Sequence, residues 1–432
     1  MSSHSPSWSV ALHSKLTAVS SKPNGSGKIH HALSSLDLAM AQHTLHMVFY
    51  YRDHQDVFFE SFGLDWWRQS LSELLTMYPT VTGRLLEQGH HGNWQVKCND
   101  AGVRVVKATV DATLSQWLQS ASASQEALLV SWDHMPLDPT TWSPFQIQIS
   151  NFKEGGVAIG ISCSHMLADL TCLASFFKSW TLVHRNFPIT NPPSFSPLPF
   201  SPQPLSNGDA KRPQPSMQTK DMAKATFKFS SSAMKQCLSN FHDICPNATP
   251  FDFLCALFWT RISHLKPLKN NDQTHCSLSI CIDFRKRLLK SPIPFGYFGN
   301  ALHFTKLSLE NKDLGSVVSA VNRHLAGLEE EEIWSAMGLL GSSNRCMYGA
   351  ELTCVSMEAQ PYEAMFSDNE KPVHVSCHVG NVAGEGLIMV MPSCEEGLAR
   401  AVTVMLPHEE LAELIKDDAI LQLKPTTLFA DI

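Results

Sequence analysis

Apolar side chains recur at two different spacings along this chain, and together they predict both strands and helices. Residues 44–51 are aromatic and β-branched, which favours a buried strand. Residues 64–78 repeat apolar side chains at helical spacing and stop before Pro79, so we expect a helix there. Residues 8–12 alternate between apolar and polar side chains, which predicts a short edge strand next to a loose tail.

Two strand pairs are predicted in the first half of the chain. Residues 94–98 and 103–110 alternate around an Asn-Asp-Ala-Gly turn, which is typical of a hairpin. Residues 145–149 and 157–163 flank a Gly-Gly turn and predict a second pair. The last of these strands leads towards a helix that we expect from about residue 170 to residue 183.

The second half of the chain has the same mixture of elements. A helix is expected near Ser231, whose hydroxyl can cap free amides, and another over residues 251–262, with Pro250 at its first turn. A last helix is expected after Pro407. The predicted strands are residues 226–229, 277–282, 351–357, 374–378 and 386–392. Since strands and helices alternate irregularly in both halves, we expect α/β domains with mixed sheets.

A proline-rich segment divides the chain nearly in half. Residues 187–215 contain nine prolines, a density that excludes a regular helix or a central strand. We interpret this segment as an extended linker. The prediction is therefore an N-terminal domain of residues 1–186, a crossover linker of residues 187–215 and a C-terminal domain of residues 216–432.

Composition narrows the class of protein. The chain has 432 residues, of which 44% are hydrophobic and 17% are charged, so it is long enough for two or three globular domains. Its net charge of −7 and the lack of a basic field argue against a nucleic-acid partner. No apolar run approaches the length of about 18 residues that a membrane-spanning helix needs.

The scattered cysteines indicate a reducing compartment. The twelve cysteines are scattered without CxxC spacing, which is typical of a cytoplasmic protein without a disulfide framework. With no CxxC and no HExxH we expect no metal site, and we interpret the doublets His30-His31 and His90-His91 as surface loops. The serine-rich leader before Asp37 resembles a transit peptide in composition, but it lacks arginine and an amphipathic period.

His165 is the candidate for acid–base chemistry. It follows an apolar strand and precedes a helix, and Asp169 comes four residues later, as HxxxD. A histidine can take a proton from a hydroxyl or amine nucleophile. The spacing is weak by itself, because a second copy, His134 to Asp138, lies in a proline-containing stretch. A structural histidine at a strand end is the competing interpretation.

Other catalytic signatures are missing from the sequence. There is no GxSxG elbow, no GxxxxGK[ST] phosphate loop and no GxGxxG. A nucleotide-containing ligand would therefore bind without a glycine-rich loop. The acidic run of residues 329–332 is interpreted as a solvated helix face.

Five stretches together resemble the BAHD acyl-CoA-dependent acyltransferases of plants, and their order and separations agree over nearly the whole chain. The matching stretches are residues 33–37 (LSSLD), 78–85 (YPTVTGRL), 164–169 (SHMLAD), 283–287 (DFRKR) and 292–301 (PIPFGYFGNA).

This resemblance implies a fold and a set of roles. The family has two similar domains of the chloramphenicol-acetyltransferase type, joined by a long crossover loop, with a channel between them. Acyl-CoA would enter the channel as ligand or substrate, and no cofactor would be bound permanently. His165 would be the general base, while Asp169 would turn away from the channel and pair with an arginine, here Arg285.

The chain departs from the second family signature, DFGWG. In residues 361–372, Met365 replaces Asp, Phe366 is kept, Ser367 replaces Gly and one residue is added, while Met357 stands where a Trp is expected. A retained HxxxD beside a degenerate DFGWG resembles the Eceriferum/Glossy branch of cuticular wax synthesis. Further matches to this branch are residues 38–40, 98–106 and 348–353.

Two functions follow from the resemblance and remain open at the level of sequence. The first is promotion of very-long-chain acyl-CoA elongation together with a condensing enzyme, a ketoacyl-CoA synthase, at the surface of the endoplasmic reticulum. The second is CoA-dependent O- or N-acyl transfer with His165 as base. A third interpretation is a protein of the same shape that binds another ligand. In each case we expect a monomer.

Overall fold

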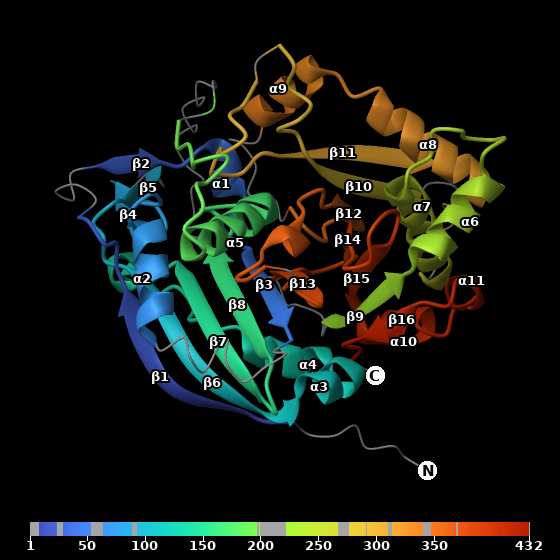
Figure 1. Cartoon of the computed structure of the whole chain (residues 1–432). Helices are drawn as coiled ribbons and strands as arrows, with labels where there is room; N and C mark the ends of the chain where they lie inside the picture. Colours follow the sequence, from blue (N-terminus) through green and yellow to red (C-terminus); the bar gives the residue numbers. More distant parts are fainter. Residues whose placement is uncertain are drawn as a thin grey trace.

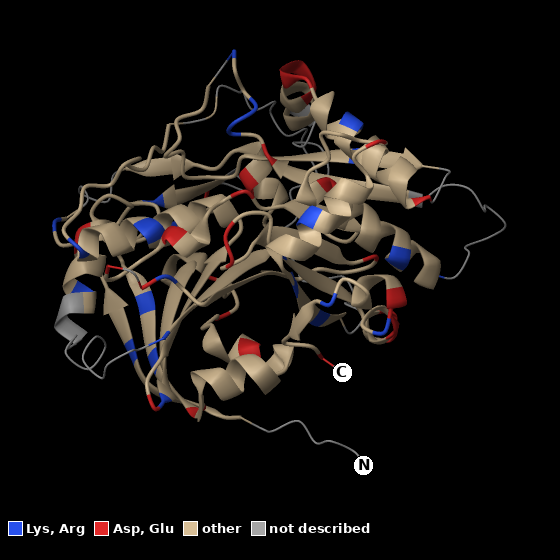
Figure 2. Ribbon diagram, turned by 45° about the vertical axis from the view of Figure 1, so that its right-hand side comes forward, with Lys and Arg blue, Asp and Glu red and all other residues tan. Residues whose placement is uncertain are grey.

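Two large sheets and one small sheet organise the chain in the computed structural model (Figure 1). Acidic and basic positions are interspersed along the ribbon (Figure 2). The structure describes residues 8–23, 29–52, 64–88, 93–196, 198, 222–266, 276–290, 292–309, 313–339, 347–368 and 370–431. Within these residues no helix has the length and apolar character needed to cross a membrane.

The first sheet has six strands in the order β1-β6-β7-β8-β3-β13. Neighbouring strands are antiparallel except for the parallel pair β6 and β7. The strands are β1 (Val10–Ala18), β3 (Thr44–Tyr51), β6 (Val103–Thr113), β7 (Phe145–Lys153), β8 (Val157–Ser164) and β13 (His374–Gly380). β1 lies at the edge, as the alternation near the amino terminus predicts.

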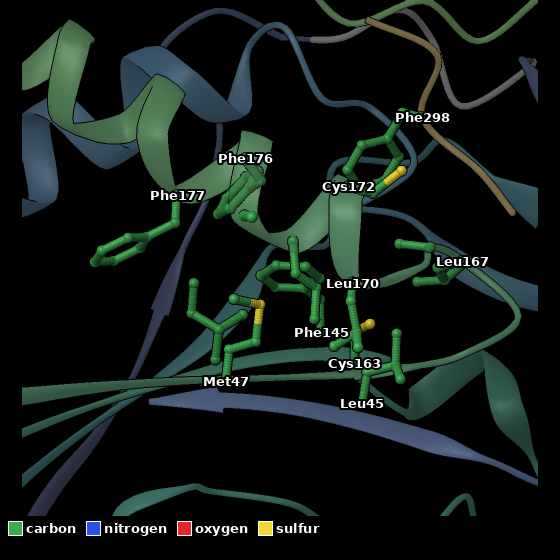
Figure 3. Packing of buried hydrophobic residues seen from close by; sticks show 14 of the residues in the cluster. Leu45, Met47, Phe145, Cys163, Leu167, Leu170, Cys172, Phe176, Phe177 and Phe298 are labelled. Atoms are coloured by element: carbon green, nitrogen blue, oxygen red, sulfur yellow. The ribbon is translucent and has the colours of Figure 1, made fainter. Parts of the chain in front are cut away.

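The alternation of side chains along these strands gives the first sheet one apolar face and one polar face. Leu45 and Met47 of β3 point to the helix-covered face and pack below α5 (Leu170–His184), in a core that includes α2 (Leu64–Leu75) (Figure 3). On β3 the side chain between them, His46, points to the other face. There its imidazole is buried and stacks on His378 of β13, with ring centroids 4.5 Å apart.

The second sheet has seven strands in the order β11-β10-β12-β14-β15-β9-β16. The strands are β9 (Met222–Phe229), β10 (Cys276–Asp283), β11 (Leu302–Leu309), β12 (Thr353–Ser356), β14 (Leu387–Pro392), β15 (Arg400–Pro407) and β16 (Thr426–Leu428). The flanking helices are α6 (Ser231–Asn240), α7 (Pro250–Leu265), α8 (Leu314–Ala326), α10 (His408–Leu414) and α11 (Asp418–Leu421). Their apolar faces form a second core, with Phe258 of α7 fully buried in it.

Shorter elements complete the described fold. β2 (His30–Ala32), β5 (Asn93–Lys97) and β4 (Arg84–Gln88) form the small sheet, in that order. The short helices are α1 (Ser35–Ala39), α3 (Leu114–Ser120), α4 (Ala123–Glu126) and α9 (Glu330–Leu339), with 3-10 turns at Ala127–Leu129, Pro139–Thr141 and Pro361–Glu363.

One strand crosses between the two halves of the sequence. β13 comes from the second half, yet it pairs with β3 along its whole length and completes the first sheet; in Figure 1 the orange strand lies beside the blue one. Of the predicted linker, residues 187–196 and 198 are described and include no helix, while its remaining residues lie outside the described part. An isolated parallel β-bridge joins Ser194 of this segment to Tyr297 in the second half, and the rings of Phe195 and Phe298 lie 5.7 Å apart.

The predicted hairpin between residues 94–98 and 103–110 is wrong. β5 pairs with β4 and β2 in the small sheet, whereas β6 pairs with β1 and β7 in the six-stranded sheet. Between the two strands, the buried guanidinium of Arg84 donates to the carbonyls of Gly102 at 2.9 Å and Ala101 at 3.0 Å. Alternation identified both strands, but it carried no information on their partners.

Candidate active site

His165 lies at the junction between β8 and α5. β8 ends at Ser164, and α5 begins after its N-cap Asp169, so the imidazole belongs to a short turn between two rigid elements. The His165 amide donates to the carbonyl of His43 at 3.1 Å. Only 1% of the His165 side chain is exposed, so in this structure the imidazole is closed off from solvent.

Both nitrogens of the His165 ring have a partner. Nδ1 lies 3.0 Å from the carbonyl oxygen of Ala168, and Nε2 lies 3.0 Å from the hydroxyl of Tyr348. A carbonyl oxygen can only accept, so Nδ1 carries the proton and Nε2 has the lone pair. The Tyr348 hydroxyl therefore donates to the nitrogen that a general base would use.

Burial also weakens His165 as a base. Desolvation lowers its pKa from 6.5 to about 4, although the Asp169 carboxylate opposes that change. The neutral form is the one that can accept a proton. However, burial destabilises the conjugate acid at this site, which reduces the driving force for proton abstraction.

Asp169 is a capping and pairing residue in this structure. Its Oδ1 accepts from the Cys172 amide at 3.0 Å, at the start of α5, and its Oδ2 accepts from Arg285 Nη1 at 2.8 Å and the Ala301 amide at 2.9 Å. Burial would raise the pKa of Asp169, but the charge of Arg285 and these hydrogen bonds hold it below its usual value. The ion pair expected between Asp169 and Arg285 is present.

Arg285 extends this pair into the loop after β10. Its Nη1 also contacts Asp283 Oδ2 at 2.9 Å, and its Nη2 donates to the Gly299 carbonyl at 2.8 Å. Thr171 of α5 donates to the same Asp283 carboxylate at 2.7 Å. The guanidinium thus joins the HxxxD turn to the loop that carries residues 297–300.

Asp37 and Asn300 support the turn from its other side, and sequence reasoning did not assign them a role. The Asn300 side-chain amide donates to Asp37 Oδ1 at 2.8 Å and to the His165 carbonyl at 2.7 Å. Asp37 is buried, and its pKa is raised by desolvation. Both residues lie inside stretches that resemble family motifs, so the signal was available. Tyr348 was missed as well, although it begins one of the branch-specific stretches.

The segment that replaces DFGWG is held by its retained aromatic residue. Phe366 is 2% exposed, and its ring lies 4.8 Å from that of Trp67 and 5.6 Å from that of Trp180, between centroids. On the surface Asp368 pairs with Arg185 at the end of α5. Buried aromatic contacts of Phe366 therefore anchor this loop.

The cleft found near this network does not include His165. It has a volume of about 120 Å³, opens beside α5 and is lined by Tyr78, Cys172, Lys178, Arg285 and Phe298, among others. It therefore borders the Asp169–Arg285 side of the turn, not the Nε2 side of His165. Over the described ranges, no cluster of three His, Cys, Asp or Glu residues could hold a metal ion.

Known proteins resemble this chain in sequence and in fold. The Transferase family matches residues 9–420. Protein ECERIFERUM 2 from Arabidopsis thaliana is 25% identical over 407 residues, which cover 88% of this chain and 91% of that protein. Rosmarinate synthase from Plectranthus scutellarioides is 28% identical over 330 residues, which cover 71% of this chain and 74% of that protein.

Solved structures show the same fold. The crystal structure of vinorine synthase matches with a TM-score of 0.76 at 20% identity, covering 96% of this chain and 98% of that one. TRI101 from F. sporotrichioides, complexed with Coenzyme A and T-2, matches with a TM-score of 0.70 at 15% identity, covering 92% of this chain and 99% of that one. These likenesses confirm the α/β fold with two sheet-rich domains that the sequence predicts.

Proposed function

This chain belongs to the Transferase family, as a BAHD-type member, and from that membership we propose that it promotes very-long-chain acyl-CoA elongation for cuticular wax. In this proposal it acts with a condensing enzyme and does not itself transfer acyl groups through His165. The similarity to Protein ECERIFERUM 2 and Protein ECERIFERUM 26 of Arabidopsis thaliana supports a wax-related role. The branch-specific stretches in the sequence support the same assignment.

One observation carries the non-catalytic half of the proposal. The lone pair of His165 Nε2 accepts a hydrogen bond from Tyr348 at 3.0 Å, and the whole imidazole is buried. A general base needs that lone pair to face the proton that it removes. Nε2 is engaged and the pKa of His165 is lowered to about 4. In this proposal the HxxxD turn therefore has a structural role and not a catalytic one.

Acyl-CoA is the ligand that we propose. TRI101, which shares the fold, has been solved as a complex with Coenzyme A. In this proposal residues 1–186 and 216–432 form the two domains around the ligand, and residues 187–215 connect them. The protein would act as a monomer on the cytoplasmic surface of the endoplasmic reticulum, beside the ketoacyl-CoA synthase.

Acyl transfer is the second candidate function. The contacts of Asp169 with Arg285 and of Asn300 with the His165 carbonyl keep the HxxxD turn in order, as an O- or N-acyltransferase would require. The similarity to rosmarinate synthase favours this candidate. It requires that Tyr348 leaves Nε2 before an acceptor can bind.

The test of the proposed function is co-expression with a very-long-chain ketoacyl-CoA synthase in yeast. The measurement is the chain-length profile of the cellular acyl groups. We expect longer chains when both proteins are present than with the synthase alone. An unchanged profile with normal amounts of folded protein would contradict the proposal.

A second arm of the same experiment tests the acyltransferase candidate. Purified protein is incubated with palmitoyl-CoA and a set of alcohol and amine acceptors, and the release of free CoA is followed by chromatography. Rapid acceptor-dependent release by the wild-type protein would favour catalysis over assistance to elongation.

A further inference from the structure

We propose that the Tyr348 hydroxyl occupies the place of an acceptor hydroxyl on His165 and thereby withholds this imidazole from acyl transfer. The inference rests on the proposed function, because it names the residue that keeps the HxxxD turn inactive. Tyr348 is not itself a catalytic residue in this inference. It affects acyl transfer only by occupying the lone pair of His165 Nε2.

The hydrogen bond has the direction that an acceptor would have. Because Ala168 takes the Nδ1 proton of His165, Nε2 is the acceptor and the Tyr348 hydroxyl is the donor, at 3.0 Å. An alcohol about to lose its proton to a general base would donate to the same lone pair at a similar distance. The two hydroxyls would need the same volume, so they exclude one another.

The Tyr348 ring is held in this position by its neighbours. It is 2% exposed and stacks on the His165 ring, with centroids 5.7 Å apart and an angle of 21° between planes. The His43 ring meets it edge-on at 4.9 Å, and the Phe304 ring at 5.4 Å. Displacing this hydroxyl would therefore break several buried contacts at once.

The backbone beside Tyr348 is equally constrained. Gly349 has a φ of +98°, and a Cβ at this position would lie 1.7 Å from the carbonyl oxygen of Ala383. The Glu385 amide donates to the Gly349 carbonyl at 2.8 Å. Only glycine fits here, so the backbone approaches closely and presents Tyr348 to His165 from a fixed turn.

Removing the hydroxyl alone would leave room for one oxygen atom against Nε2. In Tyr348→Phe a water could then donate to His165. Its oxygen would attack the thioester carbonyl of acyl-CoA while Nε2 takes its proton. The carbon–sulfur bond would break, and the departing CoA thiolate would receive that proton from the imidazolium.

The experiment measures release of free CoA from palmitoyl-CoA by the purified full-length protein, with water as acceptor. We expect Tyr348→Phe to release CoA about 10²-fold faster than the wild-type protein, the lower range of general-base catalysis. The gain should disappear in the double variant with His165→Ala. Tyr51→Phe is the matched control, since Tyr51 is also buried and donates to the Ala364 carbonyl at 2.9 Å, away from His165. It should not raise CoA release.

A second measurement reports on Nε2 without any catalysis. Diethylpyrocarbonate acylates a neutral imidazole nitrogen with an available lone pair, and peptide mass spectrometry locates the label. We expect His165 to be labelled several-fold faster in Tyr348→Phe than in the wild type or in Tyr51→Phe. A folded Tyr348→Phe protein with no increase in either measurement would overturn the inference. So would His165-dependent CoA release by the wild type at the rate of the variant.

Failure of this inference can be told apart from failure of the proposed function. The elongation profile in yeast tests the function with Tyr348 in place, whereas CoA release and labelling test only the contact between Tyr348 and His165. A lengthened profile with no effect of Tyr348→Phe would overturn the inference and leave the function standing. An unchanged profile, together with faster CoA release and labelling in Tyr348→Phe, would overturn the proposed function and leave the inference about Tyr348 standing.

Discussion

Asp169 and Arg285 lie 116 residues apart in the chain, yet Asp169 Oδ2 accepts a hydrogen bond from Arg285 Nη1 at 2.8 Å. Their side chains are only 1% and 5% exposed. A buried ion pair of this kind costs desolvation energy when it forms, so it contributes less to net stability than its geometry suggests. Breaking it from one side is expensive, because the remaining charge stays buried without its partner.

Replacement of Asp169 should therefore destabilise the fold. We expect Asp169→Ala to lower the free energy of unfolding by about 3–5 kcal/mol. The loss should lie towards the lower end of this range, because Asp283 continues to pair with Arg285. The measurement is urea unfolding of the purified protein. Lys371→Ala is the control, because its pair with Glu396 is largely exposed and its loss should hardly move the unfolding midpoint. Equal midpoints for Asp169→Ala and the wild type would contradict the prediction.

The imidazole of His165 should be dispensable for assistance to elongation. We expect yeast cells that co-express His165→Ala and the condensing enzyme to retain most of the lengthened acyl chains. The reason is that Nε2 is already engaged by Tyr348. Protein amounts must be compared in both strains, because His165 is buried. Loss of the longest chains at a normal protein level would restore the catalytic interpretation.

Buried histidines on the polar face of the first sheet should make stability depend on pH. Desolvation lowers the pKa of both His46 and His374 from 6.5 to about 3, with the charge of Lys224 adding to the effect. The unfolded chain therefore binds more protons than the folded one below about pH 6.5. It follows that stability is present above that pH and is lost progressively as the pH falls towards the folded values.

The expected slope is about 1.4 kcal/mol per pH unit for each such histidine. Urea unfolding between pH 7 and about pH 4 should show a free energy of unfolding that decreases with falling pH, and His46→Gln should flatten the curve. A curve of the same steepness in the wild type and in His46→Gln would show that this histidine is not buried in its neutral form.

The loop that replaces DFGWG should depend on Phe366. Five aromatic rings surround it at centroid distances of 4.8–5.7 Å, those of Trp67, His184, Trp180, Tyr51 and Phe177. Phe366→Ala would leave a cavity among them and should cost about 3–5 kcal/mol of stability. In contrast, Asp368→Ala removes only the pair with Arg185, in which Asp368 is 86% exposed, and should cost under about 1 kcal/mol. A cost for Asp368→Ala as large as that for Phe366→Ala would contradict this account of the loop.

Local patterns in the sequence were sufficient for most elements. The helix expected over residues 251–262 is found at Pro250–Leu265, where Thr249 and Asp252 form a capping box. The strand expected over residues 44–51 is found with those bounds. Helix caps and side-chain periodicity depend on residues within a few positions of each other, so a single sequence records them.

Strand partners could not be predicted in the same way. Residues 94–98 and 103–110 looked like a hairpin because they are adjacent, but each strand pairs elsewhere. β13 was expected as a strand, and nothing in its residues indicated that it joins the first sheet beside β3. A buried strand shows its alternation whichever neighbour completes it, so pairing is decided by the packing of the whole chain.

The candidate site divides along the same line. From the sequence alone, a resemblance to family motifs selected His165, Asp169 and Arg285, and it suggested that the last two would pair. Only the tertiary structure decided the state of His165, since the hydroxyl that takes its lone pair belongs to Tyr348, 183 residues away. A motif records which residues are kept at short spacing. The hydrogen-bond partners of the His165 imidazole depend on side chains that folding brings together from distant parts of the chain. The burial that lowers its pKa depends on the same side chains.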